Sequence, residues 1–364
     1  MWRKVGSIIG VILAVAVIVA YICIASHLAQ QHRSQQSVAE VLVSMSDSTA
    51  TQRFASSEQI RSRLQASRFK LENMPIDSVD AVAVAAFVAQ SSFVRQADVY
   101  VTYSGKVYVD IKQHQPVLRL LSGGCNSYVT AEGEIFNSPK GSAYYTSVVT
   151  GTYKPLFGRN FEGNVAIYRA ERESEENEKL LKLAEELSAK KAELRQCKSR
   201  IEELKKSRRK TILERIFKDD EGYRQRQVGV KADIAECEKE LAEISKHIAL
   251  LGDKRLVVER RKQKLYRKCD DFCNLVNFVS RVNRDSFWSA EVVQFDVDTT
   301  LMGEISLRLI PRSGSFVVEF GTLDKSEEKL NKLLNFYEKG LSYLGWDRYK
   351  TVDIRYDKQV ICTE

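Results

Sequence analysis

Side chains that could carry out chemistry are few in this chain of 364 residues, and they stand far apart in the sequence. Of the four histidines, His27 and His32 border a long apolar segment, His114 falls in a predicted strand and His247 in a heptad pattern. A zinc site or a histidine-activated nucleophile needs such residues in one cluster. No nucleophile-elbow, zinc-protease or phosphate-loop motif occurs. The sequence therefore predicts no catalytic site, metal or cofactor, although its many carboxylates leave an acid–base enzyme of the cell envelope open.

The apolar segment Val5–Ile24 predicts a single transmembrane helix, because its twenty residues carry no charge. At about 1.5 Å per residue they span about 30 Å, the thickness of one bilayer core. Arg3 and Lys4 precede the segment. The positive-inside rule then keeps residues 1–4 in the cytoplasm and places the bulk of the chain outside the plasma (inner) membrane, in the periplasm. A cleaved signal peptide is the alternative, but its apolar region usually runs about 7–15 residues.

The net charge of +8 is confined to one segment, residues 169–268, which hold 29 basic and 21 acidic residues. The remainder of the chain is neutral, so a general nucleic-acid-binding surface is not predicted. Two basic clusters, Lys205–Lys210 and Glu259–Lys264, have two interpretations. They are either the solvated face of a coiled coil or a surface attracted to anionic lipid or an acidic partner.

Elements in the order β, α, α, β, β are predicted after the apolar segment. Residues 37–45 alternate as a strand does, and Ser56–Gln59 has the capping-box pattern that begins a helix. A second helix is expected over Ile76–Val94, with Asp77 as its N-cap. Two alternating runs around Ser104-Gly105 predict a β-hairpin.

The stretch SSFVRQADVYVTYSGKVYVDIKQHQPVLRL (Ser91–Leu120) resembles the end of the POTRA domain in the bacterial cell-division family FtsQ/DivIB. SYVTAEGEIF (Ser127–Phe136) and the closing GWDRYKTVDIRYDKQVICTE (Gly345–Glu364) are similar to later elements of the same family. The resemblance implies an α+β fold. It places a POTRA domain over residues 36–118 and a mixed, mostly antiparallel β-domain over residues 119–168 and 267–364.

The same resemblance implies a non-enzymatic divisome scaffold that recruits the bitopic division proteins FtsB and FtsL during septum formation. A membrane-fusion adaptor of an efflux or secretion pump is the alternative, because such proteins also combine one anchor with a helical hairpin inserted in a β-domain. Adaptors flank that hairpin with lipoyl half-motifs. Residues 270–288 do not fit such a motif, since their pattern predicts helix.

Heptads occupy residues 169–266, a segment that the FtsQ/DivIB family does not ordinarily carry. If two arms fold back antiparallel, facing residues must have numbers with a constant sum. Six apolar pairs, among them Cys197 with Cys237, sum to 434 or 435. This predicts an antiparallel coiled-coil hairpin with its turn near residues 217–218. An oxidising compartment would allow Cys197 and Cys237 to form a disulfide, and two packed thiols are the alternative.

The last candidate site is the C-terminal segment TVDIRYDKQVIC (Thr351–Cys362). Val352, Ile354 and Tyr356 alternate with charged residues, as in a half-buried strand. A terminal strand at a sheet edge exposes unpaired backbone groups to which another chain can add. By position, the family resemblance assigns side-chain contacts with the partner to Tyr356 and Lys358. Asp353, Arg355 and Val360 of the same segment are the other predicted partner-binding residues. The alternative is a strand that is paired internally and closed off by its charges.

Overall fold

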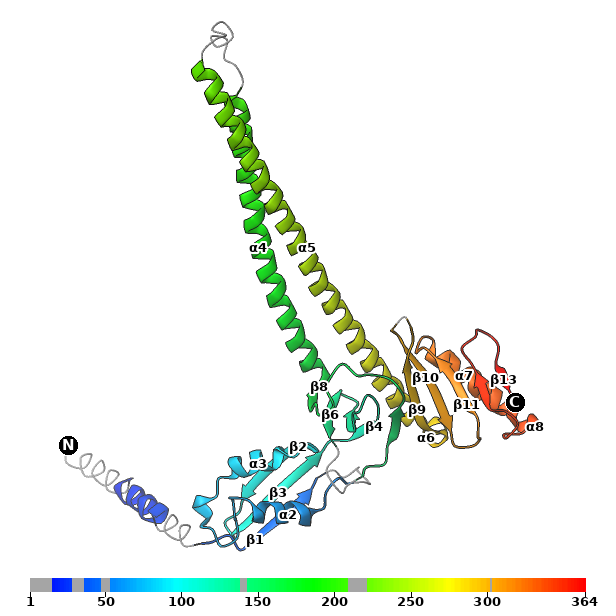
Figure 1. The fold of residues 1–364 in the computed structure, drawn as a ribbon. Coiled ribbons are helices and arrows are strands. Elements are labelled where there is room, and N and C mark those ends of the chain that lie inside the picture. The colour runs from blue at the N-terminus through cyan, green and yellow to red at the C-terminus, as the bar shows by residue number, and fades with distance from the viewer. Residues whose placement is uncertain (1–14, 28–35, 47–52, 138–142, 209–220, 302) are drawn as a thin grey trace, which may run out of the picture. The chain divides into compact units, whose positions relative to one another are not determined.

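The computed structural model describes residues 15–27, 36–46, 53–137, 143–208, 221–301 and 303–364 (Figure 1). The chain forms two compact units. One unit comprises Met1–Gly163 together with Asn274–Glu364, and the other is the intervening segment Asn164–Cys273. The first unit holds a three-stranded and a ten-stranded sheet, and the second is helical. The fold is therefore mixed α+β.

Residues 15–27 form an α-helix that includes the second half of the predicted membrane span. Its apolar side chains are exposed, for example Val17 at 61% and Ile22 at 59%. Residues 5–14 of the predicted span lie outside the described residues. In the part of the chain that the structure describes, no helix is both long enough and apolar enough to cross a bilayer.

A three-stranded sheet covered by two helices follows. β1 (Glu40–Met45) lies parallel to the central strand β3 (Lys106–Gln113), and β2 (Val94–Val101) pairs antiparallel with the other side of β3. α2 (Ser57–Ala66) and α3 (Ala81–Ala89) come between β1 and β2 in the chain. Helices and sheet share one core, which includes Ile60, Leu64, Val84, Val107 and Val109. The predicted β-α-α-β-β order is confirmed.

The two helices differ in how well the sequence predicts their starts. α2 begins at the predicted capping box, in which Ser56 and Gln59 bond to each other's main-chain N–H groups. The second helix is shorter than predicted, because a 3-10 turn, η1 (Ile76–Ser78), ends in extended backbone before it. The N-cap is Asp80 and not Asp77, so that prediction was wrong.

A ten-stranded mixed sheet has the strand order β13-β12-β11-β10-β9-β7-β4-β5-β6-β8. Parallel pairs occur at β4–β7, β7–β9 and β11–β12. Its strands are β4 (Pro116–Leu120), β5 (Ser127–Thr130), β6 (Glu134–Asn137), β7 (Ser147–Thr150), β8 (Gly163–Asn164), β9 (Val292–Thr299), β10 (Ile305–Pro311), β11 (Val317–Gly321), β12 (Thr351–Asp353) and β13 (Ile361–Thr363).

The parallel pair β7–β9 joins the strands before the long helices to the strands after them. Val148–Thr150 pairs with Gln294–Asp296 across this boundary. Side chains add to the backbone pairing, because Thr150 Oγ1 donates to Asp296 Oδ1 (3.1 Å) and Arg308 on β10 donates to Asp296 Oδ2 (2.5 Å). The two halves therefore form one sheet, and the helical segment is an insertion between them.

Four helical elements accompany this sheet. They are the last turns of α5 (Glu221–Arg284), the short α6 (Trp288–Glu291), α7 (Ser326–Phe336) and α8 (Ser342–Leu344), with a π-helical turn, η2 (Tyr337–Leu341), between the last two. Phe278 of α5 is 4% exposed, with its ring centroid 6.0 Å from that of Phe295 on β9 and 5.0 Å from that of Phe320 on β11. The end of α5 therefore belongs to the core of the β-domain.

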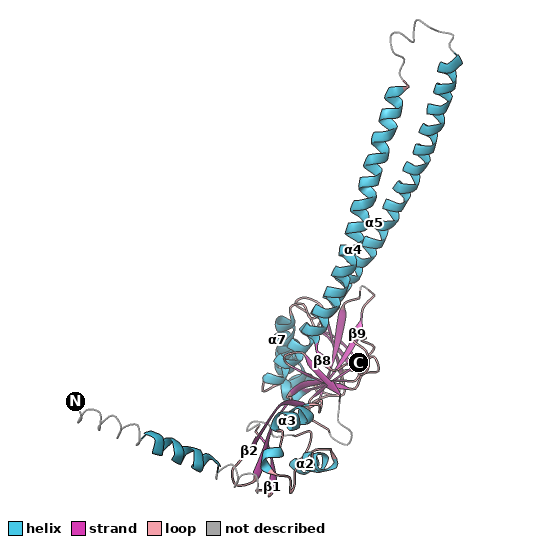
Figure 2. Ribbon diagram, turned by 90° about the vertical axis from the view of Figure 1, so that its left-hand side faces the viewer, coloured by secondary structure: helices cyan, strands magenta, loops and turns pink. Residues whose placement is uncertain are grey.

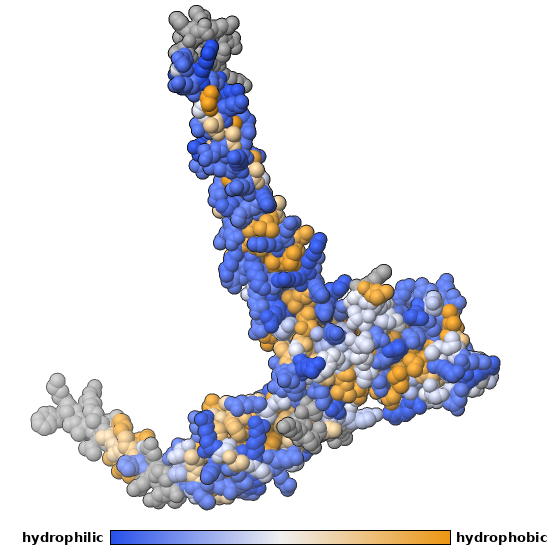
Figure 3. All heavy atoms as spheres, in the orientation of Figure 1, coloured by the Kyte–Doolittle hydropathy of each residue, from blue (hydrophilic) through white to orange (hydrophobic). Residues whose placement is uncertain are grey.

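The inserted helices α4 (Val165–Ser207) and α5 run side by side as an antiparallel pair (Figures 1 and 2). The predicted facing residues Cys197 and Cys237 are in contact, and Ile201 is buried beside them. On the face that Figure 3 shows, the surface of the pair is mostly hydrophilic. The predicted turn at residues 217–218 lies outside the described residues.

Polar contacts fix the alignment of the two helices where the first turns of α4 face the later turns of α5. Lys262 Nζ lies 3.3 Å from a carboxylate oxygen of Glu173 and donates to Asn177 Oδ1 at 2.8 Å. Arg169 donates to Asp270 at 2.8 Å. Polar contacts of this kind specify the register of paired helices, because a slip would separate the partners.

We expect Cys197 and Cys237 to be oxidised to a disulfide in protein taken from an oxidising compartment. Both thiols are buried and free in the structure, and Cys197 Sγ lies 3.4 Å from the main-chain oxygen of Cys237. The two residues therefore occupy one layer of the helix pair, as a bridge requires. Peptide mapping without reduction should recover the two peptides linked. Recovery of both thiols free from such protein would show that they only pack together.

Removal of residues 172–266 is expected to leave the rest of the chain folded. Arg169 and Asp270 are bonded across the helix pair, so a linker of about four residues can join the cut ends. The shortened chain should unfold cooperatively in a thermal melt. A matched deletion of residues 172–284 also removes Phe278 from the core and should not fold. Loss of cooperative unfolding in the shorter deletion would show that the hairpin is part of the core.

Candidate partner interface

The C-terminal segment forms two short strands joined by a loop. β12 pairs parallel with β11 on one side and antiparallel with β13 on the other. The predicted strand pattern of Val352–Asp357 is therefore followed only as far as Asp353, and β13 is the terminal strand of the sheet. The chain reverses because the Asp353 carboxylate accepts the main-chain N–H of Arg355 (3.0 Å) and because Lys358 adopts a left-handed conformation (φ 61°).

The predicted partner-binding residues are thus divided between strand and loop. Asp353 lies in β12, whereas Arg355, Tyr356, Lys358 and Val360 lie in the loop that leads to β13. The predicted alternation holds for the buried Val352 and Ile354. It fails at Tyr356, which is 48% exposed, because the chain has left the strand by then.

A carboxylate–guanidinium pair closes the start of this loop. Arg355 Nε donates to Asp353 Oδ1 at 3.0 Å, and a terminal nitrogen of Arg355 donates to Asp353 Oδ2 at 2.6 Å. Burial alone would raise the pKa of the Asp353 carboxyl, but hydrogen bonds from the side chain and main chain of Arg355 outweigh burial and lower it. The stability that this pair adds is therefore present above the unfolded pKa of the carboxyl and is lost as pH falls through the lower folded pKa.

Helix α7 holds the loop from the side. Lys332 Nζ donates to the main-chain oxygens of Ile354 (2.8 Å) and Tyr356, and Lys325 Nζ lies 3.6 Å from a carboxylate oxygen of Asp357. Sequence reasoning missed Lys332, because a lysine on the polar side of an amphipathic helix gives no sign of a distant main-chain partner. These contacts of Lys325 and Lys332 fix the residues that precede β13.

A small cavity of about 120 Å³ lies between α7 and this loop. Most of its lining is cationic, and the burial of Lys329 lowers the pKa of that ammonium group. The lining residues are Lys325, Glu328, Lys329, Lys332, Arg355, Asp357 and Lys358. The cavity between α7 and the loop therefore favours anionic groups of a bound segment.

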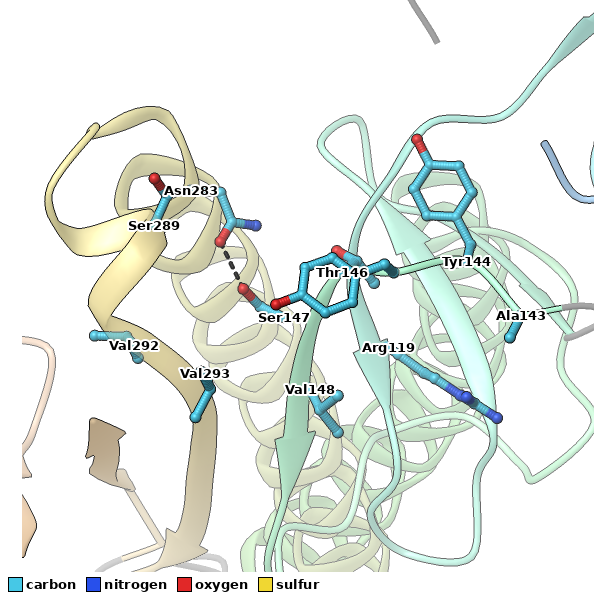
Figure 4. Close-up of a pocket in the computed structure, with 11 residues that line it drawn as sticks. Arg119, Ala143, Tyr144, Thr146, Ser147, Val148, Asn283, Ser289, Val292 and Val293 are labelled. Carbon is cyan, nitrogen blue, oxygen red and sulfur yellow. Dashed lines mark hydrogen bonds between the residues drawn. The ribbon is translucent and has the colours of Figure 1, made fainter. Parts of the chain in front are cut away.

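The larger cavities of this unit contain polar groups but no recognisable catalytic set among the described residues. In a cavity of about 740 Å³, Ser147 Oγ donates to Asn283 Oδ1 at 2.6 Å (Figure 4). A cavity of about 840 Å³ contains His114, whose ring stacks on Phe136 and whose pKa is lowered by burial. Over the described ranges, no three metal-ligating side chains gather in a geometry that could hold an ion.

Two family models match the chain. A POTRA-like domain model matches residues 37–112, the segment that forms the three-stranded sheet and its helices. A model described as FtsQ/DivIB, C-terminal related, matches residues 254–363, from within α5 to β13. Together the two matches support an assignment to the FtsQ/DivIB family. A search of curated proteins gives no match.

The POTRA-like match ends before the inserted helices, and the FtsQ/DivIB-related match begins within the second of them, α5. The C-terminal match includes the last turns of α5, which agrees with the burial of Phe278 in the sheet core. It also includes the loop and β13, so the candidate interface lies in a family segment. Residues 113–253, which include strands β4 to β8 and helix α4, lie outside both matches.

Proposed function

We propose that this chain is a non-enzymatic scaffold of the divisome that recruits FtsB- and FtsL-like bitopic proteins during septum formation. The family matches support a role in cell division. The observation that carries the finer proposal is the position of β13 at the end of the ten-stranded sheet.

Recruitment by β13 would use backbone pairing. A strand at the end of a sheet has one side without a strand partner, and an extended segment of another protein can add there by main-chain hydrogen bonds. Ile361 is 43% exposed and supplies an apolar contact, and the basic cavity beside the loop supplies an attraction for carboxylates. The two features together favour an extended partner segment that carries acidic residues.

We further propose that Val5–Ile24 anchors the chain in the plasma membrane, with the two units outside the cytoplasm. The charge-free run of twenty residues supports this placement. The basic clusters of the inserted helices then lie on the outer side of the plasma membrane, where they are available to anionic lipid or to an acidic partner.

Depletion of the protein in growing cells tests the proposal. Cells that lack it should grow into filaments without septa. Re-expression of the full chain should restore division, whereas re-expression of a chain without residues 359–364 should not. Normal division accompanied by defects in drug efflux or secretion would contradict the divisome role and favour the membrane-fusion adaptor.

A further inference from the structure

The outer face of the three-stranded sheet carries a surface that the proposed function does not use. Along β2 and β3, side chains alternate between the core shared with α2 and α3 and the opposite face. Tyr100 and Tyr108 are cross-strand partners on that opposite face. Their rings stack with centroids 5.0 Å apart and planes 8° apart, and Tyr100 is 47% exposed. The sheet therefore presents an aromatic ring face to its surroundings.

Two carboxylates oppose each other in the next row of the same face. Asp98 on β2 pairs with Asp110 on β3 in the antiparallel register. Like charges placed directly opposite each other destabilise a sheet. Hydroxyl and amide donors reach them, since Ser44 donates to Asp110 and Gln96 Nε2 donates to Asp98 at 2.9 Å. These neutral donors leave both negative charges in place.

The cations nearest along these strands are bonded elsewhere. Lys106 Nζ lies 3.2 Å from a carboxylate oxygen of Glu40, and Lys112 Nζ donates to Gln96 Oε1 at 3.4 Å. Among the described residues, no lysine or arginine forms an ion pair with Asp98 or Asp110. Among the described residues, the acidic pair beside the tyrosine stack therefore has no cation in an ion pair with it, although Lys112 is bonded to the Gln96 side chain that donates to Asp98. A departure of this kind from the pairing rules is typical of functional sites.

We propose that Tyr100, Tyr108, Asp98 and Asp110, here called the Tyr–Asp surface, bind an arginine- or lysine-bearing segment of a partner protein. A cation held over a tyrosine ring is attracted by the ring. The adjacent carboxylates form charge-assisted hydrogen bonds with the same group, and its charge removes their mutual repulsion. The Tyr–Asp surface is complementary in charge to a cationic side chain, and it contains no residue of the C-terminal strand.

The test measures binding of a fluorescent hexa-arginine peptide to the full chain in a neutral detergent. The double variant Asp98→Asn, Asp110→Asn should bind at least about tenfold more weakly. Its thermal unfolding temperature should stay the same or rise, because the repulsion is gone. A matched charge change at the exposed Glu338, Glu338→Gln, should leave binding unchanged. Equal binding by wild type and the double variant would overturn the proposal.

A second pair of variants examines the aromatic ring. Tyr100→Phe keeps the ring face but removes the hydroxyl that is hydrogen-bonded to Asp110, and it should lose less than about threefold in affinity, whereas Tyr100→Leu should lose about threefold to tenfold. Equal loss in both variants would count against the ring contact.

Calcium ions at millimolar concentration should not raise the thermal unfolding temperature of the wild type by binding to Asp98 and Asp110. A rise that is seen in the wild type and is absent in the double variant would identify a cation site and overturn the peptide assignment.

Discussion

Ile361→Pro is expected to weaken binding of an FtsB-like partner about 100-fold, equivalent to about 2.8 kcal/mol. Proline has no N–H group and fixes its own backbone, so it cannot take part in a ladder. If the N–H of Ile361 faces outward, the partner loses a donor. If it faces β12, β13 is released from the sheet and no longer presents an edge. Both cases remove the docking strand, and a pull-down or titration with the purified partner segment measures the loss.

Ile361→Ala is the matched control for this prediction. It removes the same apolar side chain, which is 43% exposed, and keeps the backbone donor. We expect a loss of about tenfold or less. Ile361 is the position chosen for the substitution because Val360 lies in the loop and outside β13. Both variants should retain cooperative unfolding, since neither touches the buried Val352 or Ile354. Equal binding by the proline and alanine variants would argue against backbone pairing at β13.

Phe278→Ala is expected to lower the free energy of unfolding of the sheet-containing unit by about 3–5 kcal/mol. The ring is 4% exposed and packs against Phe295 and Phe320 from two strands, so its removal leaves a cavity that the sheet cannot close. Chemical denaturation of the purified chain, followed by near-ultraviolet circular dichroism, measures the change.

Leu256→Ala serves as the control on the same helix. Leu256 is 44% exposed, and its loss should cost less than about 0.5 kcal/mol. A cost below about 1 kcal/mol for Phe278→Ala would mean that the end of α5 is not part of the β-domain core. It would also contradict the reason for keeping residues 267–284 in the chain from which residues 172–266 are removed.

Local chemistry predicted much of the POTRA-like region. The capping box at Ser56 and the turn at Ser104-Gly105 involve residues within three or four positions of one another, so their partners can be read from the sequence. The facing position of Cys197 and Cys237 was likewise predictable, because the residue numbers of facing residues in an antiparallel helix pair have a constant sum. In each case the contact can be predicted from the spacing of the two residues in the sequence.

The C-terminal reversal could not be predicted in this way. Asp353, Arg355 and Asp357 alternate with apolar residues as a strand requires, yet the chain leaves the strand after Asp353. The bond from Arg355 to Asp353 competes with the extended conformation, and Lys332 holds the loop from a helix 22 residues earlier than Ile354. Side-chain contacts to backbone of this kind carry no periodic signal.

Hydrogen–deuterium exchange of the full chain, with and without a purified FtsB-like segment, tests the central claim most directly. Added-strand binding should slow exchange of the main-chain amides of Ile361–Thr363 and of the loop from Arg355 to Val360, while the rest of the ten-stranded sheet changes little. Tight binding of the segment with unchanged exchange over these residues, and protection elsewhere in the chain, would show that β13 is not the docking edge.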